Sequence, residues 1–118
     1  MGDFGLFVGW SGPVRGREEG SSKVFGEAVA LWTRLQNDGE IESWEAAFLE
    51  PHGGDLAGFF LIRGDRDNLA RLRFSDDMLR LNIRAGHIVE GFGVVGAELG
   101  PRIESSMTDW LAAAAELT

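Results

Sequence analysis

The sequence predicts an α+β domain in which strands and helices follow the order β-α-β-β-α-β, with one further helix at the end. Two observations lead to this prediction. Apolar residues recur in some segments with the period of two that is typical of a strand, and in others with the 3.6-residue period of an α-helix. Turn residues, mostly glycine, separate these segments. The 118 residues are expected to form a single domain, 1–118, because a domain usually takes about 100–200 residues.

The first part of the chain is predicted to form a strand, a helix and a second strand. Apolar side chains alternate with others over residues 4–10, which indicates a strand. Over residues 17–37 the period becomes helical, with apolar positions at Phe25, Ala28, Val29, Trp32 and Leu35. Asn37-Asp38-Gly39 is typical of a helix C-cap, and the second strand is expected over 41–50.

The middle of the chain is predicted to form a hairpin followed by two helical segments. The glycines of residues 51–55 favour a hairpin loop, which leads into a third strand over 56–63. Asp65 is the expected N-cap of a short helical turn over 66–72, and Ser75 is the expected N-cap of the next helix. We expect Gly86 to end that second helix.

The last part of the chain is predicted to form a fourth strand and a terminal helix. The strand is expected over 88–99 and ends before Pro101. From Arg102 onward one apolar stripe follows helical spacing; its members are Ile103, Met107, Trp110, Leu111, Ala114 and Leu117. The complete order is the ferredoxin-like βαββαβ pattern with a C-terminal helix.

Both faces of the predicted sheet are apolar. In the third strand Leu56, Phe60 and Ile62 share one face, while Ala57, Phe59 and Leu61 share the other. Two helices cover one face only, so we expect a homodimer in which the sheets of two subunits pack face to face. The alternative is that the C-terminal helix folds back over the open face. Glycines in the predicted strands favour close approach of another backbone; they are Gly5, Gly9, Gly58, Gly91, Gly93 and Gly96.

Composition excludes several classes of partner. Lys and Arg total 11 against 19 Asp and Glu, a net charge of -8, which argues against binding to nucleic acid or to an anionic membrane. The absence of cysteine excludes disulfides and thiolate metal sites. No apolar run approaches the roughly 18 residues of a membrane span, and no signal segment is evident, so a cytoplasmic location is expected.

Two histidines and a few other side chains are the candidates for chemistry. The predicted topology puts His52 and His87 at the same end of the sheet, where a histidine can act as a general base. Ligand-binding candidates are Trp10, Trp44, Glu50 and Arg84. The alternative is that His52 is a solvated turn residue and His87 a polar strand start. No metal-ligand spacing is present, so neither a metal nor a cofactor is expected.

Four segments carry a resemblance to a known family. They are Gly5-Leu6-Phe7-Val8-Gly9-Trp10, Pro51-His52-Gly53-Gly54-Asp55, Leu69-Ala70-Arg71-Leu72-Arg73-Phe74-Ser75-Asp76-Asp77-Met78 and Gly91-Phe92-Gly93-Val94-Val95. With them, nearly the whole chain resembles the dimeric α+β barrel superfamily, and within it an uncharacterised member. The resemblance implies ferredoxin-like homodimers with an apolar cleft between helices and sheet. The asparagine, tryptophan and histidine of the haem-degrading members have no counterpart here, and the chain has no tyrosine, which is frequent in the clefts of aromatic-polyketide oxygenases.

The functional hypothesis that follows is binding of a small apolar or aromatic molecule in that cleft. One alternative is a cofactor-independent monooxygenase or isomerase of the antibiotic-biosynthesis monooxygenase type. A second alternative is a structural or regulatory dimer without a ligand. Whether the protein is an enzyme, and what its ligand is, stay open at this point.

Overall fold

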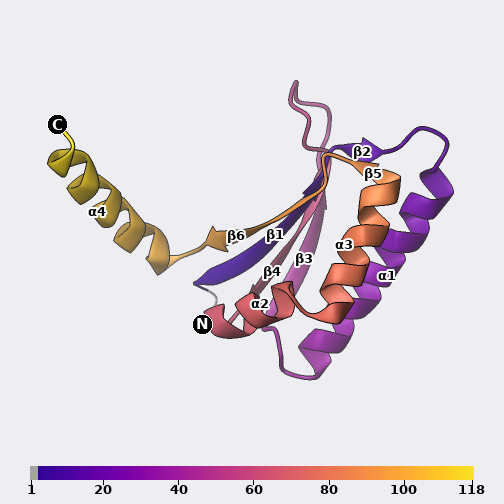
Figure 1. The fold of residues 1–118 in the computed structure, drawn as a ribbon, viewed down its shortest axis with the longest axis horizontal. Helices are drawn as coiled ribbons and strands as arrows, with labels where there is room; N and C mark the ends of the chain where they lie inside the picture. The colour runs from indigo at the N-terminus through magenta and orange to yellow at the C-terminus, as the bar shows by residue number, and fades with distance from the viewer. Residues whose placement is uncertain (1–2) are drawn as a thin grey trace.

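The computed structural model describes residues 3–118 and has a four-stranded antiparallel sheet at its centre (Figure 1). In spatial order its strands are β3 (Ser43–Phe48), β4 (Gly58–Gly64), β1 (Phe4–Trp10) and β6 (Gly93–Glu98). The helices are α1 (Glu18–Asn37), α2 (Arg66–Arg73), α3 (Asp76–Ile88) and α4 (Pro101–Glu116). The βαββαβ order with a terminal helix is therefore confirmed. Helices α1, α2 and α3 lie on one side of the sheet, and α4 stands apart on the other (Figure 1).

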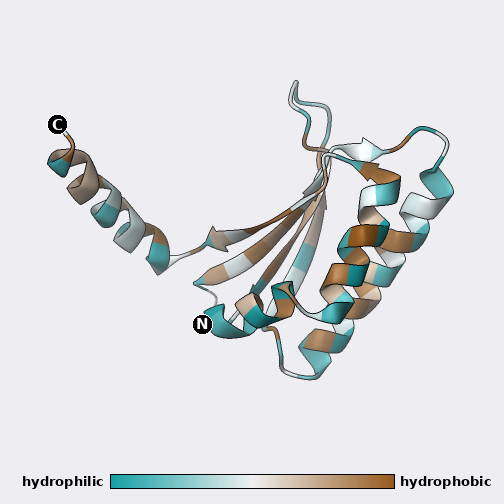
Figure 2. Ribbon diagram, viewed as in Figure 1, coloured by the Kyte–Doolittle hydropathy of each residue, from teal (hydrophilic) through white to brown (hydrophobic). Residues whose placement is uncertain are grey.

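The hydrophobic core lies between the sheet and the layer of α1, α2 and α3. Alternate residues of β1 and β4 point into it, as the period of two predicts, and Trp32 of α1 is completely buried. Phe60 is the centre of an aromatic cluster: its ring lies 5.0 Å from Phe25, 5.4 Å from Trp10 and 5.7 Å from Trp32. Figure 2 shows hydrophobic segments on the ribbons of α1 and α3 that make up this layer.

Both predicted helix N-caps are confirmed. The Asp65 carboxylate accepts a hydrogen bond from the backbone N–H of Asn68 at 3.1 Å, and α2 begins at the next residue. The Ser75 hydroxyl accepts one from the N–H of Met78 at 3.4 Å and donates another to the Leu72 carbonyl at 2.7 Å. Each side chain satisfies a backbone N–H that the first helical turn leaves without a partner.

The prediction that Gly86 ends the second helix is wrong. Helix α3 continues through Gly86 to Ile88, and the N–H of Val89 still bonds the Ala85 carbonyl. A glycine that ends a helix commonly takes the left-handed conformation, whereas Gly86 keeps a negative φ and stays helical. His87 therefore lies in the last turn of α3 and is not a strand start.

The predicted fourth strand is broken in two. β5 (Val89–Glu90) pairs with β2 (Gly12–Pro13) in a separate small sheet, and β6 joins the main sheet after the break. Gly91 sits at the break with φ +64°, and a Cβ on it would lie 2.1 Å from the Ser11 hydroxyl oxygen. The second and third strands are shorter or shifted relative to the expected 41–50 and 56–63.

The face of the sheet opposite α1–α3 is open and apolar. The Phe7 and Phe59 rings pack on it with centroids 5.1 Å apart, and Val95, which pairs with Phe7 in register, is 51% exposed. The alternative in which the C-terminal helix covers this face is wrong, because no residue of α4 is buried. The open face is bordered by an ion pair between Arg63 and Glu45 at 3.2 Å.

Close approach at two of the strand glycines comes from the chain's own sheet. A Cβ on Gly5 would lie 2.9 Å from the Ile62 carbonyl oxygen, and one on Gly58 would lie 2.8 Å from that of Ala47. A side chain at either position would push neighbouring strands apart. Around Gly93, in contrast, the described chain leaves open space.

Candidate functional site

A cleft of about 460 Å³ lies between the sheet and helices α1 and α3, at the end of the domain where β2 and β5 pair. Its walls come from β1, β3, β4, both helices and the segment around β5. The lining residues are Val8, Trp10, Pro13, Glu18, Ser21, Ser22, Val24, Phe25, Ala28, Phe48, Phe60, Leu81, Ala85, Ile88, Val89 and Phe92. Clefts of about 300–1,000 Å³ with predominantly apolar walls are typical of small-molecule sites.

Aromatic rings form one wall of the cleft. Trp10 ends β1, and its indole lies edge-on to Phe25 of α1 at 6.2 Å and to Phe48 of β3 at 6.3 Å. Phe25 and Phe48 are themselves 5.4 Å apart. Phe48 is 71% exposed although it faces this cluster, so its ring stands at the mouth. A flat aromatic molecule would find stacking and edge contacts here.

The cleft has few polar side chains. Ser21 and Ser22 come from the first turns of α1, and Glu18 is the only ionisable residue among the described residues that line the cleft. Glu18 is exposed, and its carboxylate accepts a hydrogen bond from the backbone N–H of Gly16 at 3.2 Å. The cleft therefore favours apolar contact, with few polar side chains available to a ligand.

Of the predicted ligand-binding residues, the structure places Trp10 in the cleft. Trp44 points to the same side of the sheet and lies edge-on to Phe60 at 6.2 Å, but it packs against the core and does not line the cleft. Glu50 is exposed beyond the end of β3.

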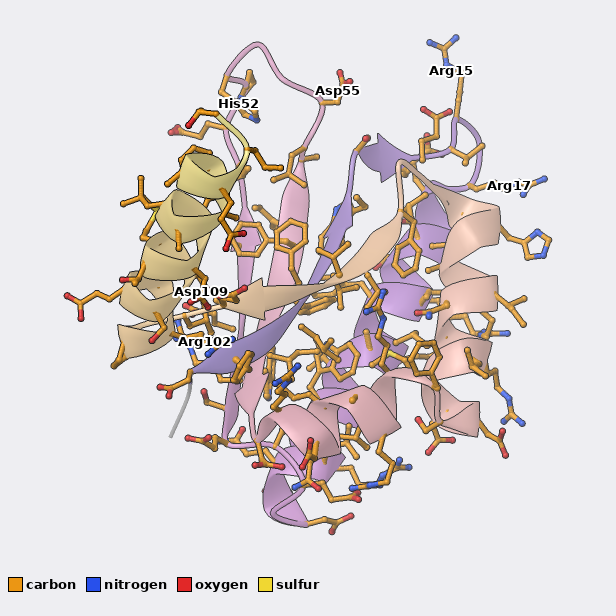
Figure 3. All side chains as sticks on the ribbon, turned by 60° about the vertical axis from the view of Figure 1, so that its left-hand side comes forward. Arg15, Arg17, His52, Asp55, Arg102 and Asp109 are labelled. Atoms are coloured by element: carbon orange, nitrogen blue, oxygen red, sulfur yellow. The ribbon has the colours of Figure 1, made fainter. Side chains whose placement is uncertain are left out.

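The hairpin loop holds His52 away from the cleft. Figure 3 shows His52 and Asp55 on the protruding connection between β3 and β4, at the opposite end of the sheet from Arg102. The His52 ring bonds within its own loop: Nε2 is 2.9 Å from the Leu56 carbonyl oxygen, and Nδ1 accepts from the N–H of Gly54 at 3.3 Å. These contacts brace the loop.

Arg84 and His87 lie on the exposed side of α3. Arg84 forms a two-point ion pair with the Glu27 carboxylate of α1 at 2.7 and 2.8 Å. The hydrogen bond from Arg84 lowers the pKa of Glu27, and the same bond raises the pKa of Arg84. His87 is exposed, and its backbone carbonyl accepts a hydrogen bond from Arg17 at 2.5 Å. The two histidines do not converge on the cleft, and their catalytic role stays a prediction.

Sequence reasoning did not assign Phe25, Phe48 or the two serines to a site. In the sequence, Phe25 stands out only as a member of the helical apolar stripe. Its position near the start of α1 could have pointed to the site. This part of the helix lies beside the end of β1, where Phe25 contacts Trp10. Phe48 follows Trp44 and Ala46 on the core-facing side of β3, as the pairing with β4 shows.

No group of three histidine, aspartate or glutamate side chains that would hold a metal ion occurs within residues 3–118. In the same part of the chain, no helix combines the length and the apolar character needed to cross a membrane.

Comparison with protein-family models gives no match, and comparison with curated protein sequences gives none either. Solved structures do match. A protein of the dabb family with a ferredoxin-like fold from Mesorhizobium loti is 14% identical, with a TM-score of 0.65; the match covers 85% of this chain and 100% of that one. A dimeric ferredoxin-like protein of unknown function from Bacteroides fragilis is 11% identical, with a TM-score of 0.59 and coverage of 81% and 95%.

A third similar structure is that of an enzyme. SnoaB, a cofactor-independent oxygenase from Streptomyces nogalater, is 15% identical, with a TM-score of 0.53; the match covers 85% of this chain and 94% of that one. At such identities the likeness is one of fold. The chain therefore has a ferredoxin-like fold, as the order of its strands and helices predicted.

Proposed function

We propose that this protein is a cytoplasmic homodimer in which each subunit binds a small apolar or aromatic molecule in the cleft between its helices and its sheet. The observation that carries the proposal is the cleft itself, which is large enough for such a molecule, walled by aromatic rings and lined by few polar side chains. A ligand that replaces water there gains apolar contact without leaving a charged group unpaired.

The open face of the sheet supports the homodimer. Phe7, Phe59 and Val95 lie on a surface that no helix of the described chain covers. Large exposed apolar patches on soluble proteins mark interaction sites. The similar structure from Bacteroides fragilis is described as dimeric, which makes a second copy of the same face the expected cover.

A cofactor-independent oxygenase is the second candidate, because an oxygenase shares this fold. An enzyme of this kind needs a base to take a proton from its substrate. Glu18 is the one ionisable side chain among the cleft's described lining residues, and it stands at the rim. The composition of the walls therefore favours binding over catalysis.

A neutral fluorescent probe, N-phenyl-1-naphthylamine, tests the proposal. We expect its emission to rise on binding and the protein's melting temperature to rise with probe concentration. Ser22→Trp, which places a bulky ring at the rim, is expected to abolish both responses. Thr33→Trp, an exposed position of the same helix away from the cleft, is the matched control and is expected to leave them unchanged.

Two results would contradict binding in the cleft. One is equal loss of probe binding in both variants. The other is no response of the wild-type protein to the probe or to a panel of aromatic compounds, which would favour the structural or regulatory dimer. Consumption of oxygen with a hydroxylatable aromatic compound would instead support the oxygenase.

A further inference from the structure

Helix α4 extends away from the rest of the molecule. Of the described residues, none of those in α4 is buried, and the helix lies on the side of the sheet opposite α1–α3 (Figure 1). The radius of gyration of the chain is 16.1 Å, against about 13.5 Å for a compact domain of this length. The projecting helix accounts for this extended shape.

One side of α4 is apolar and exposed. Met107 is 53% exposed, Trp110 65% and Leu111 57%, and with Ile103 and Leu117 they form one stripe at helical spacing. In Figure 2 the helix carries hydrophobic segments although no other element lies beside it. The opposite side, around Ser105 and Ala112, has no large apolar residue. Such a stripe is expected to be covered by another surface.

The length of α4 leads to the same expectation. An isolated helix shorter than about 12–15 residues is marginal in water, and most of a helix's stability in a protein comes from packing of its apolar side. With 16 residues, α4 lies only just above that length. Trp110 alone is a large apolar group that a soluble monomer would be expected to bury.

The base of α4 contacts the rest of the chain. The N–H of Leu99 donates to the Asp3 carbonyl at 2.8 Å. Arg102 lies over the Phe4 ring at 5.4 Å and 3.6 Å from the Glu98 carboxylate. Among the described residues, no side-chain hydrogen bond, ion pair or ring contact joins the part of α4 beyond Arg102 to another element. The contacts of Arg102 join the first turn of α4 to the ends of β1 and β6.

The surface area indicates what covers the stripe. The chain exposes 7678 Å², whereas a compact monomer of 12.9 kDa exposes about 6,300 Å². The excess of about 1,400 Å² is larger than the roughly 800 Å² that each partner contributes to a standard protein interface. The α4 stripe projects on the same side of the sheet as the open face (Figure 1), and both surfaces expose large apolar side chains.

We propose that α4 is an arm that packs its apolar stripe against the body of a second copy of this chain. This inference rests on the homodimer of the proposed function. A second sheet on the open face brings the partner's body to the side of the sheet into which α4 projects, so the sheet contact and the arm form one continuous interface. In a two-fold dimer the exchange is reciprocal, and each subunit is held by the other's arm.

Photo-crosslinking tests the arm directly. The chain has no cysteine, so Met107→Cys introduces a single thiol within the stripe, which takes a benzophenone maleimide. We expect illumination to produce a covalent dimer of about twice the 12.9 kDa chain mass, with cross-linked peptides that map to the partner's body. Ala112→Cys, on the opposite side of the same helix, is the matched control and is expected to produce little dimer.

Light scattering on the same samples separates the possible failures. A dimeric mass with links only within one chain, or with no links, overturns the arm and leaves the homodimer standing. A monomeric mass overturns the homodimer of the proposed function and the arm with it. Met107→Glu/Trp110→Glu is expected to weaken the dimer roughly tenfold or more. Ser105→Glu/Ala112→Glu, with the same added charge, is expected to have little effect.

Discussion

Val95→Glu is the most direct test of the open sheet face. Complete burial of a valine side chain contributes about 1.5–3 kcal/mol, so burial of the half that Val95 exposes, 51%, contributes about 1 kcal/mol. A two-fold dimer loses this contribution twice, about 2 kcal/mol, which raises the dissociation constant about 30-fold. Each introduced carboxylate also loses hydration without gaining a partner. We therefore expect the dissociation constant to rise by at least about 30-fold.

Sedimentation of a dilution series measures that constant. Ile83→Glu is the control, because Ile83 is an apolar residue of the outer side of α3 that is 66% exposed and lies away from the open face. It is expected to leave the dimer intact. A Val95→Glu protein that stays dimeric at every accessible concentration would refute the assignment of this face as the interface. So would an equal effect of the two substitutions.

Three further predictions concern the fold and can be measured by urea unfolding. Phe60→Ala removes the centre of the aromatic cluster and is expected to cost about 3–5 kcal/mol; a cost under about 1 kcal/mol would contradict the packing described. Gly91→Ala forces an L-residue into φ +64°, which is expected to lower the free energy of unfolding by about 1–2 kcal/mol. The new methyl group would also clash with the Ser11 hydroxyl. Adding Ser11→Gly removes the clash but not the backbone strain, so it is expected to restore only part of the lost stability. The Glu27 pKa is lowered by Arg84, so the ion pair stabilises the fold at neutral pH and this stabilisation is lost as pH falls through the folded-state pKa. The free energy of unfolding should therefore be slightly higher for the wild type than for Glu27→Gln at neutral pH, and the two values should converge in acid. A difference in unfolding free energy that grows in acid would contradict this prediction.

Local patterns were enough to predict most of the fold. The alternation over residues 4–10 predicts β1 with its observed bounds, because a half-buried strand shows its two faces directly in the sequence. Asp65 and Ser75 predict the starts of α2 and α3, because a cap acts on backbone groups two or three residues away. In each case the interaction that decides the structure lies within a few residues.

The candidate site was predicted less completely. Trp10 was found because it is an aromatic residue at the end of a strand, next to a turn. His52 and His87 share one end of the molecule, but neither lines the cleft. His52 is bonded within its own hairpin loop, and His87 lies in the last turn of α3 on the side that faces away from the cleft. The position of a residue in the sequence does not show in which direction its side chain points at the end of a helix or within a loop.

By itself, the sequence determined the order of strands and helices, the apolar character of both faces of the sheet and the apolar stripe of the last helix. Only the tertiary structure decided where that helix lies, where the fourth strand breaks and which aromatic rings meet at the cleft. The break at Gly91 depends on Ser11, eighty residues earlier in the chain, and Trp10, Phe25 and Phe48 meet from three separate elements. Contacts between distant segments depend on how whole layers pack, and no local period of the sequence encodes them.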